Sequence, residues 1–337
     1  MSGVNDTVKK FRILISGAGQ MGKAHAEFLS QEPDCEIVSV VRRPVSTEHE
    51  TNGGPSTAFN AAMAEVRPDL AIIASPHGFH FSQVMTALKA GCHVLVEKPM
   101  GLSLEEVDAM HQSATERGLL LVEGLQRRYE SVATTARSLI NELGTMTLVH
   151  GLFAHGFPSG KLSEWRSQPE IAGQGIVDDS LIHMLDLMLF VAGGSLRKLS
   201  SEFLSPREIP VRPSSLTFTA ITSFGTLISG SCSYAAPLGS VQEEISFYGT
   251  KGSLFVRRFC LEWNAEPPLM CFKSADGTEA RQIDAASLPC GRMLPLKSML
   301  SVLRGDAPRE SLLSASSQTL STHQALEAIR SLARLAQ

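Results

Sequence analysis

Residues 11–22 of this 337-residue chain read FRILISGAGQMG, an apolar run followed by three glycines in a GxGxxG pattern. Between a strand and a helix, this pattern is typical of a loop that binds the pyrophosphate of a dinucleotide. Gly17 permits the tight turn, Gly19 lets the backbone approach the phosphates, and Gly22 lets the helix pack closely on the strand. The helix N-terminus then offers free N–H groups and a positive dipole end. We therefore predict a cofactor-binding loop made of Gly17, Gly19, Gln20, Met21 and Gly22; the alternative is a glycine turn without a ligand.

The sequence around this loop repeats a strand-and-helix pattern. Short apolar runs occur from Phe11 to Val122, namely FRILIS, EIVSVV, DLAIIAS, CHVLVE and LLLVE. Such unbroken runs suit strands that are covered on both faces. Helices are predicted between them at Met21–Gln31, Phe79–Ala90 and Leu104–Arg117, the last with Ser103 and Glu106 in a capping-box pattern. This alternation predicts an α/β fold with a doubly wound parallel sheet, a Rossmann domain over residues 1–125.

The rhythm changes after Val122. Helices are predicted at Ser131–Leu143, ending at Gly144, and at Ser317–Leu335. Between them, FTAITSFGTLISGSCSYA has the pattern of a hairpin with a Phe-Gly turn, and EEISFYGTKGSLFVRR that of a further strand region. Strands joined by short turns predict a mostly antiparallel open sheet that carries helices on one side. We therefore expect a substrate-binding α+β domain over residues 126–337, with the boundary near residues 123–127.

Composition and charge exclude several classes of protein. The chain has 43% hydrophobic and 19% charged residues and a formal net charge of −4. This is an ordinary globular mixture, and without a basic block it argues against nucleic acid and membrane partners. Six cysteines without a CxxC pair predict no metal site, no disulfide framework and a reducing, cytoplasmic compartment. The polar opening predicts no signal peptide, and the longest apolar stretch, Leu181–Val191, is too short to span a bilayer.

The end of the second apolar run indicates which dinucleotide is bound. An acidic residue about twenty positions beyond the glycine loop would bind the ribose of NAD. The run EIVSVV ends instead in Arg42 and Arg43, whose guanidinium groups suit a 2′-phosphate. We therefore predict that NADP(H) is preferred, with NAD(H) possible. The alternative is that both arginines are solvated surface charges.

The apolar segment at 176–191 carries three polar groups. Asp179, His183 and Asp186 stand at i, i+4 and i+7, which places them on one face of a helix. Carboxylates desolvated there need partners, and a carboxylate near an imidazole keeps it useful for proton transfer near neutral pH. We interpret Asp179 and His183 as catalytic and Asp186 as structural. The alternative is a satisfied polar network in the core.

Polar residues also follow two of the predicted parallel strands. Lys98, within Glu97-Lys98-Pro99, comes directly after CHVLVE, and Ser75-Pro76-His77 with His80 follows DLAIIAS. Ligands of an open α/β sheet bind beyond the carboxyl ends of its strands. Lys98 is therefore placed to donate to a substrate oxygen, although an ordinary surface lysine is the alternative. For His77, simple solvation is an equal alternative.

Taken together, the chain resembles the glucose-fructose oxidoreductase / inositol dehydrogenase / rhizopine-catabolism (GFO/IDH/MocA) family. Five segments appear in family order: GAGQMGKAHAEFL, SPHGFHFSQVMTALKAGCHVLVEKPM, LQRRYE, EWRSQPEIAGQGIVDDSLIHMLDLMLF and YGTKGSL. The resemblance implies a Rossmann domain, a partner sheet that covers the nicotinamide, and a homodimer or homotetramer built on that sheet. It also implies catalytic roles for Lys98, which orients the substrate, and for Asp179 and His183, with His183 as general acid/base.

The resemblance extends the predicted site to further residues. It implies that Ser75, Pro76, His77 and His80 line the nicotinamide ribose, beside Glu97 and Lys98. It places Arg128, Trp165 and Arg166 near the nicotinamide or substrate. From its location alone we add His155 as a substrate contact, and Phe157 and Lys161 in the following loop. The sequence departs from the family pattern at Gln174, Leu181 and Ser131, which bears on substrate shape.

The function predicted from these residues is an oxidoreductase acting on a secondary alcohol of a sugar, cyclitol or sugar derivative. His183 would exchange the hydroxyl proton, Lys98 would stabilise the alkoxide, and Asp179 would hold the substrate or the imidazole. This requires Lys98 and the Asp179/His183 pair to converge over one nicotinamide ring. Alternatives are a dinucleotide-dependent sensor without catalysis, a cofactor-dependent glycosidase, or an imine reductase. The motifs leave the substrate itself open.

Overall fold

The computed structural model describes residues 10–42, 55–156, 165–238, 240–257, 269–284 and 291–335. The chain divides into two compact units. The first unit comprises residues 1–101 and 106–124, and the second comprises residues 102–105 and 125–337. Of the predicted site residues, Arg43 lies outside the described residues, as do Phe157 and Lys161.

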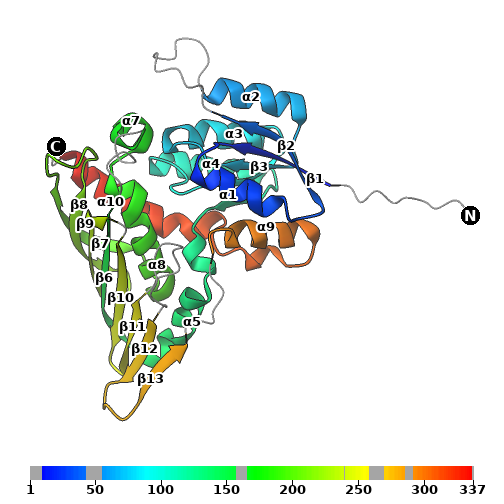
Figure 1. The fold of residues 1–337 in the computed structure, drawn as a ribbon. Coiled ribbons are helices and arrows are strands. Elements are labelled where there is room, and N and C mark those ends of the chain that lie inside the picture. The colour runs from blue at the N-terminus through cyan, green and yellow to red at the C-terminus, as the bar shows by residue number, and fades with distance from the viewer. Residues whose placement is uncertain are drawn as a thin grey trace, which may run out of the picture. The chain divides into compact units, whose positions relative to one another are not determined.

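The first unit is built on a five-stranded parallel sheet in the order β2-β1-β3-β4-β5 (Figure 1). Its strands are β1 (Phe11–Ser16), β2 (Cys35–Val41), β3 (Leu70–Ile73), β4 (His93–Val96) and β5 (Leu121–Glu123). Its helices are α1 (Gln20–Leu29), α2 (Pro55–Val66), α3 (His80–Lys89) and α4 (Leu104–Glu116). The predicted doubly wound α/β architecture is confirmed, and each of the five apolar runs forms one strand.

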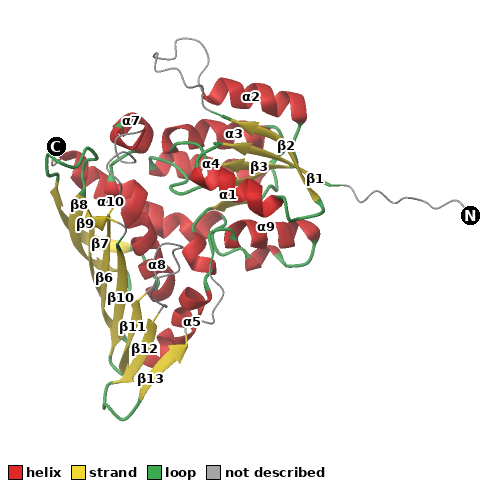
Figure 2. Ribbon diagram, viewed as in Figure 1, coloured by secondary structure: helices red, strands yellow, loops and turns green. Residues whose placement is uncertain are grey.

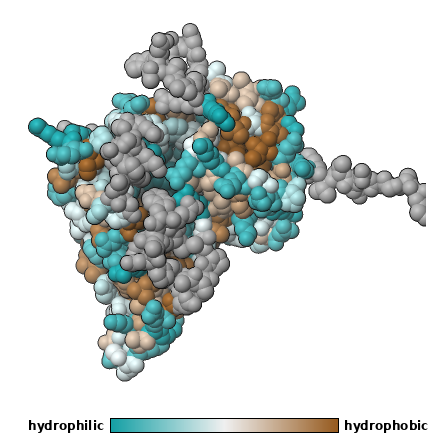
Figure 3. Space-filling view, viewed as in Figure 1, coloured by the Kyte–Doolittle hydropathy of each residue, from teal (hydrophilic) through white to brown (hydrophobic). Residues whose placement is uncertain are grey.

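Burial in this sheet follows the position of each strand. The central strand β3 is buried at every residue, because helices cover both faces of the sheet. Side chains of α2, α3 and α4, such as Phe59, Val84 and Val107, pack in one apolar cluster with Leu14 of β1. Strand β2 lies at the edge, and its Val40 is 40% exposed. The space-filling view shows apolar residues gathered in the region of β1 and β2 (Figure 3).

The second unit contains an eight-stranded sheet in the order β13-β12-β11-β10-β6-β9-β8-β7 (Figure 2). The strands are β6 (Met146–Gly156), β7 (Leu196–Leu204), β8 (Ser215–Thr222), β9 (Leu227–Leu238), β10 (Val241–Gly249), β11 (Gly252–Arg257), β12 (Leu269–Ser274) and β13 (Ala280–Asp284). The helices are α5 (Ser131–Leu139), α7 (Pro169–Ala172), α8 (Ile182–Ala192), α9 (Leu294–Arg304) and α10 (Leu320–Leu335). Among the described strands of this second sheet, only β6 and β9 pair in parallel, so the prediction of a mostly antiparallel sheet is confirmed.

One face of this sheet is covered and the other is open. Along β8 and β10, buried residues alternate with more exposed ones, the pattern of a sheet with helices on one side. The covered face packs in one apolar cluster with side chains of α5, α8 and α10. The predicted Phe-Gly turn joins β8 to β9, which pair in antiparallel register. No helix in the described part of the chain is long and apolar enough to cross a membrane.

The segment predicted as one buried helix at 176–191 has a different first turn. Residues Val177–Leu181 form a π-helical turn, η5, which runs directly into α8. A π turn is a rare insertion that changes the angular spacing of side chains and is frequent at functional sites. The regular i, i+4, i+7 spacing expected for Asp179, His183 and Asp186 therefore does not hold across this turn.

Candidate functional site

The glycine loop has the geometry that its sequence predicts. Gly17 has φ +107°, a conformation that favours glycine, and a Cβ there would lie 2.2 Å from the Ala74 carbonyl oxygen. A Cβ on Gly22 would lie 1.8 Å from the Gly17 carbonyl oxygen, so this glycine lets the helix approach the loop. A Cβ on Gly19 would meet nothing within 4 Å. The loop thus has no room for a side chain at Gly17 or Gly22, whereas the space beside Gly19 is open.

The helix that follows fits the phosphates of a dinucleotide. Helix α1 begins at Gln20, which is followed by Met21, and Gly19 is its N-cap. No side chain makes a capping hydrogen bond to its first N–H groups. Its first turn carries no acidic residue. Because an uncapped helix N-terminus presents N–H donors and a positive dipole end, the residues present suit an anionic group.

Arg42 directly follows β2, where the sequence predicts a contact to the adenosine ribose. Its side chain is exposed, and within the described residues it makes no ion pair or hydrogen bond. A carboxylate for the ribose hydroxyls is absent from this position, which Arg42 takes instead. A guanidinium there can bond a 2′-phosphate with two parallel hydrogen bonds.

His80 connects the loops that follow β3 and β4. Its Nδ1 lies 2.8 Å from the Pro99 carbonyl oxygen and its Nε2 lies 2.8 Å from the Ser75 carbonyl oxygen. The ring is 0% exposed, and this burial lowers the pKa of His80 despite both carbonyls. His80 was predicted to contact the cofactor; the structure instead makes its ring an internal brace between two strand-end loops.

A second brace in this unit was not predicted from the sequence. The hydroxyl groups of Ser16 and Ser75 each donate to Oε1 of Gln83, both at 2.9 Å. Gln83 is fully buried on α3 and ties the end of β1 to the loop after β3. Beside Ser75, Pro76 precedes a short 3₁₀ turn that starts at His77, whose side chain is 7% exposed. A polar residue on a helix carries no sequence signal for this role.

The backbone on both sides of Lys98 is held in place. Glu97 Oε1 lies 2.8 Å from Nε2 of His25, and the Met100 N–H donates to Glu123 Oε1 at 2.9 Å. Glu97 and Met100 are buried, whereas Lys98 is partly exposed. The predicted cofactor residue Glu97 is thus engaged with His25. The arrangement anchors the strand end and presents Lys98 from it.

In the second unit, two residues stand out by their exposure. From Gly175 to Val191 every residue is buried except Asp179 and His183, which are partly exposed. The ring of His183 meets the Phe153 ring edge-on, with centroids 6.5 Å apart. An apolar segment of this kind has no packing reason to expose one carboxylate and one imidazole. These are the two residues that the sequence singled out as catalytic.

Asp179 is held by residues from two other elements. The Tyr234 hydroxyl, on β9, donates to Asp179 Oδ2 at 3.0 Å, and Arg166 Nε lies 3.7 Å from the same oxygen. The Arg166 guanidinium also stacks on the Trp165 ring at 4.5 Å. The structure therefore brings three predicted site residues, Asp179, Arg166 and Trp165, together in this unit.

Tyr234 belongs to a polar network that sequence reasoning missed. Burial raises the pKa of Tyr234 well above its ordinary value, and the Asp179 carboxylate raises it further. Tyr234 therefore stays protonated and donates to Asp179. His155, predicted as a substrate contact, is 4% exposed, and its Nε2 lies 2.7 Å from the Ser180 hydroxyl. Its ring packs edge-on to Tyr234 with centroids 5.1 Å apart, so His155 supports the network from within.

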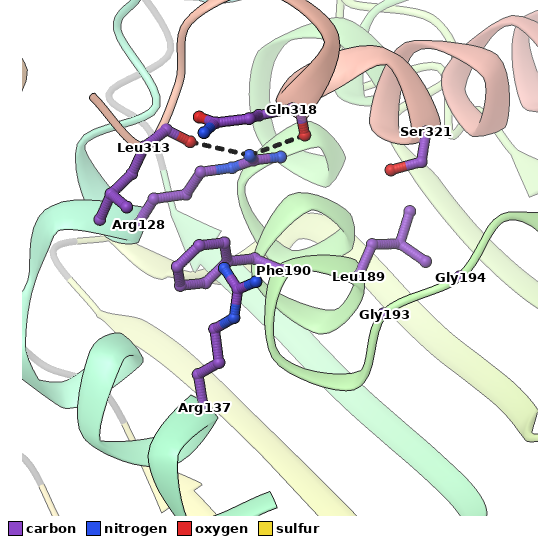
Figure 4. A pocket seen from close by; sticks show the side chains of 9 residues that line it. All are labelled: Arg128, Arg137, Leu189, Phe190, Gly193, Gly194, Leu313, Gln318 and Ser321. Atoms are coloured by element: carbon purple, nitrogen blue, oxygen red, sulfur yellow. Dashed lines mark hydrogen bonds between the residues drawn. The ribbon is translucent and has the colours of Figure 1, made fainter. Parts of the chain in front are cut away.

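Arg128 was predicted to contact cofactor or substrate, and the structure places it elsewhere. Its guanidinium is 3% exposed and bonds both carboxylate oxygens of Asp186, at 2.6 to 3.0 Å. Its Nη1 donates to the carbonyl oxygens of Leu313 and Gln318, both at 2.9 Å (Figure 4). The guanidinium donors of Arg128 therefore bond to groups in the core of the unit, which corrects the prediction that Arg128 contacts cofactor or substrate. Asp186 is structural, as the sequence indicated.

Two more buried ion pairs support the same unit. Arg127 pairs with Glu243 of β10 and stacks on Phe153 at 4.8 Å. Arg330 of α10 donates to Asp178 Oδ1 at 2.8 Å, and both side chains are at most 1% exposed. The other carboxylate oxygen of Asp178 accepts from the Gln174 N–H at 2.7 Å. Asp178 immediately precedes Asp179, so this pair anchors the π turn that carries the candidate catalytic carboxylate.

Comparison with known proteins supplies two family matches. Residues 11–125 match a profile described as an oxidoreductase family with an NAD-binding Rossmann fold, and residues 134–255 match a GFO/IDH/MocA C-terminal domain. D-glucoside 3-dehydrogenase of Escherichia coli is 29% identical over 195 residues, 56% of this chain and 55% of that protein. Glucose-6-phosphate 3-dehydrogenase of Bacillus subtilis is 31% identical over 187 residues, 53% of each chain. The chain thus spans about half the length of the curated relatives it matches.

A solved structure extends the likeness of fold over nearly the whole chain. An inositol dehydrogenase homologue of Azotobacter vinelandii, complexed with NAD⁺, superposes with a TM-score of 0.78. The match covers 99% of this chain and 98% of the other at 18% identity. At this identity the likeness concerns the fold. Within the described residues, no group of three His, Cys, Asp or Glu side chains is placed to hold a metal ion.

Proposed function

Because the chain belongs to the GFO/IDH/MocA family of oxidoreductases, we propose that it is an NADP(H)-preferring enzyme that interconverts a secondary alcohol and a ketone. The substrate class is a sugar, cyclitol or sugar derivative, in keeping with the sugar dehydrogenases among its relatives. The observation that carries the proposal is the exposure of Asp179 and His183 alone within a buried segment. A carboxylate and an imidazole presented together suit proton transfer to a bound hydroxyl.

In the oxidising direction, His183 accepts the proton of the substrate hydroxyl. Bound NADP⁺ supplies the acceptor for the hydride that leaves the same carbon, and the product is a ketone. Lys98 donates a hydrogen bond to the developing alkoxide oxygen and stabilises its charge. Asp179, held by the protonated Tyr234 and by Arg166, orients the substrate or the imidazole. In the reducing direction His183 gives the proton back.

The catalytic roles are tested by substituting His183 and Lys98 separately. We expect His183→Asn and Lys98→Met each to lower kcat by about 10²- to 10⁴-fold while NADPH still binds. Turnover would be followed by NADPH absorbance with a panel of sugars and inositols, and binding by NADPH fluorescence. Arg207→Ala, at an exposed arginine outside the site, serves as the control. Wild-type turnover in both variants would contradict the roles, and a wild-type protein inactive on the whole panel would favour the sensor alternative.

The cofactor preference is carried by Arg42. We expect Arg42→Asp to shift the ratio of kcat/KM for NADP⁺ over NAD⁺ toward NAD⁺ by about tenfold or more, because a carboxylate suits the ribose and repels a 2′-phosphate. Lys98 and the glycine loop stay intact in this variant, so turnover with NAD⁺ is its internal control. An unchanged ratio of kcat/KM for the two cofactors would indicate that Arg42 is a solvated surface residue without a role in cofactor preference.

We also propose a homodimer or homotetramer built on the open face of the eight-stranded sheet. Support comes from Tyr248, Leu148 and Leu227, which pair in register across β10, β6 and β9. Tyr248 is 44% exposed and Leu227 is 54% exposed. Light scattering of the wild type and of Leu227→Lys tests whether the open sheet face forms this oligomer. A monomeric wild type would contradict the proposal.

A further inference from the structure

A cavity of about 220 Å³ lies in the second unit where α5, α8 and α10 meet (Figure 4). Its lining includes Phe190 and the Gly193-Gly194 turn at the end of α8, Arg137 of α5, and Ser321 of α10. A water molecule takes about 30 Å³ in the liquid, so the cavity has room for a small polyatomic ligand. None of the residues just described carries the reaction proposed above.

The charge of this cavity is positive. Of its two arginines, Arg128 is neutralised by Asp186, but Arg137 is exposed and makes no ion pair or hydrogen bond with the described residues. Figure 4 shows the Phe190 ring between the two guanidinium groups, at 5.3 Å from Arg128 and 4.6 Å from Arg137. Stacking fixes the plane of the Arg137 guanidinium and leaves its edge donors available. The lining contains no carboxylate.

The opposite wall adds further donor groups. Ser321 lies in the first turn of α10, a helix of 16 residues with no acidic residue in that turn. The Ser321 hydroxyl therefore adds a neutral donor to the lining of the cavity. The carbonyl oxygens of Leu313 and Gln318, which would repel an anion, are already engaged by Arg128.

We propose that this cavity binds the phosphate group of a small ligand, with Arg137 as the charged contact and Ser321 as a neutral donor. A planar guanidinium held on one face by an aromatic ring is suited to bidentate bonding of a phosphate. The phosphate group can belong to free phosphate or to a phosphate monoester of a small polyol. Ser321 separates these sources, because only the monoester has a polar body that can extend along the cavity from Arg137.

The test is calorimetric titration of the full chain saturated with NADP⁺, so that the dinucleotide site cannot take the titrant. Inorganic phosphate, glycerol 3-phosphate and glycerol are the three titrants. We expect the two phosphates to bind with a Kd of about 1 mM and glycerol not to bind. Arg137→Gln should weaken both phosphates by about tenfold or more, and Arg137→Lys by less. Arg207→Gln, at an exposed arginine elsewhere in the unit, should leave them unchanged.

Three results would overturn the proposal. They are unchanged phosphate affinity in Arg137→Gln, equal weakening by Arg207→Gln, and loss of binding once NADP⁺ is saturating. Circular dichroism of Arg137→Gln checks its fold, and Arg137→Lys decides the matter if that variant does not fold. Ser321→Ala should weaken glycerol 3-phosphate more than inorganic phosphate if the body of the monoester reaches Ser321, and should weaken both equally if Ser321 contacts the phosphate group itself. If Ser321→Ala changes the affinity for neither titrant, Ser321 does not contact the ligand.

Discussion

The two units of this chain hold their candidate site residues by different means. In the first, backbone geometry dominates: glycines close the phosphate loop, and His80 braces two carbonyl oxygens. In the second, buried arginine–carboxylate pairs dominate, namely Arg127–Glu243, Arg128–Asp186 and Arg330–Asp178. The phosphate loop is therefore sensitive to added volume, and the residues that support Asp179 are sensitive to unbalanced charge.

This difference has an energetic reason. Glycine positions are constrained by contacts with residues nearby, and a Cβ there overlaps backbone that cannot move away. A buried ion pair costs much free energy in desolvation, so losing one partner is worse than losing both. Substitutions at both kinds of position test this contrast.

The largest effect is expected at the Asp178–Arg330 pair. Arg330→Met leaves the Asp178 carboxylate buried without its counter-charge and should lower the free energy of unfolding by about 3–5 kcal/mol. Adding Asp178→Leu in the same chain should restore part of that loss. Urea denaturation of the single and double variants measures both values. A double variant less stable than Arg330→Met would show that losing Asp178 costs more than leaving it without a counter-charge, and would contradict the contrast.

In the first unit, the matched pair is Gly22→Ala and Gly19→Ala. A Cβ on Gly22 would overlap the Gly17 carbonyl, so we expect a loss of about 1–3 kcal/mol in unfolding free energy and weak NADPH binding. A Cβ on Gly19 meets nothing, so stability should change by less than about 0.5 kcal/mol. NADPH binding should still weaken, because the methyl group occupies the open side of the loop. Thermal unfolding and fluorescence titration separate the two effects, and equal destabilisation would contradict the reading of the loop.

His80 gives the first unit a pH dependence. Its pKa is lowered in the folded chain by burial, so below the ordinary histidine pKa of about 6.5 the unfolded chain binds a proton that the folded chain does not. Unfolding free energy therefore falls as pH drops below about 6.5, by at most about 1.4 kcal/mol per pH unit from this group. His80→Gln should flatten that slope between pH 6.5 and 5. An unchanged slope would show that His80 is not responsible.

A small effect is expected at Glu327, a second acidic partner of Arg330. Its Oε2 lies 3.4 Å from Arg330 Nη1, and its side chain is 22% exposed, against 0% for Asp178. Solvent screening makes such pairs weak, so Glu327→Gln should cost less than about 1 kcal/mol. Comparing its denaturation midpoint with that of Arg330→Met places an exposed and a buried partner of one arginine on the same scale. A similar loss in both would show that burial is not what distinguishes them.

The parts of the fold that sequence reasoning found are those governed by local patterns. Apolar runs placed the strands of the first sheet, and Gly17, Gly19 and Gly22 revealed the loop because each glycine acts on near neighbours. The polar pair Asp179 and His183 was found because charge is rare in an apolar segment. Their exposure could not be predicted, since it depends on the π turn and on the packing around it.

The wrong prediction for Arg128 and the contacts that the sequence did not reveal have a common cause, which is that the partners lie far apart along the chain. Arg128 lies 58 residues before Asp186, and Arg330 lies 152 residues after Asp178, so neither sequence pattern shows the partner. Arg128 was therefore assigned to the site when its charge serves the core. Tyr234 carries no motif, and its contact with Asp179 arises only because β9 brings it to the covered face of the sheet.

The position of Arg330 has a consequence for how the protein is made. Because Asp178 is synthesised about 150 residues before its counter-ion, a ribosome-bound chain must carry that carboxylate until the helix at 320–335 has emerged. Until then the turn bearing Asp179 lacks the contact between Asp178 and Arg330. Nascent chains halted before residue 330 should accordingly lack this ion pair and pack the segment around Asp178 less stably.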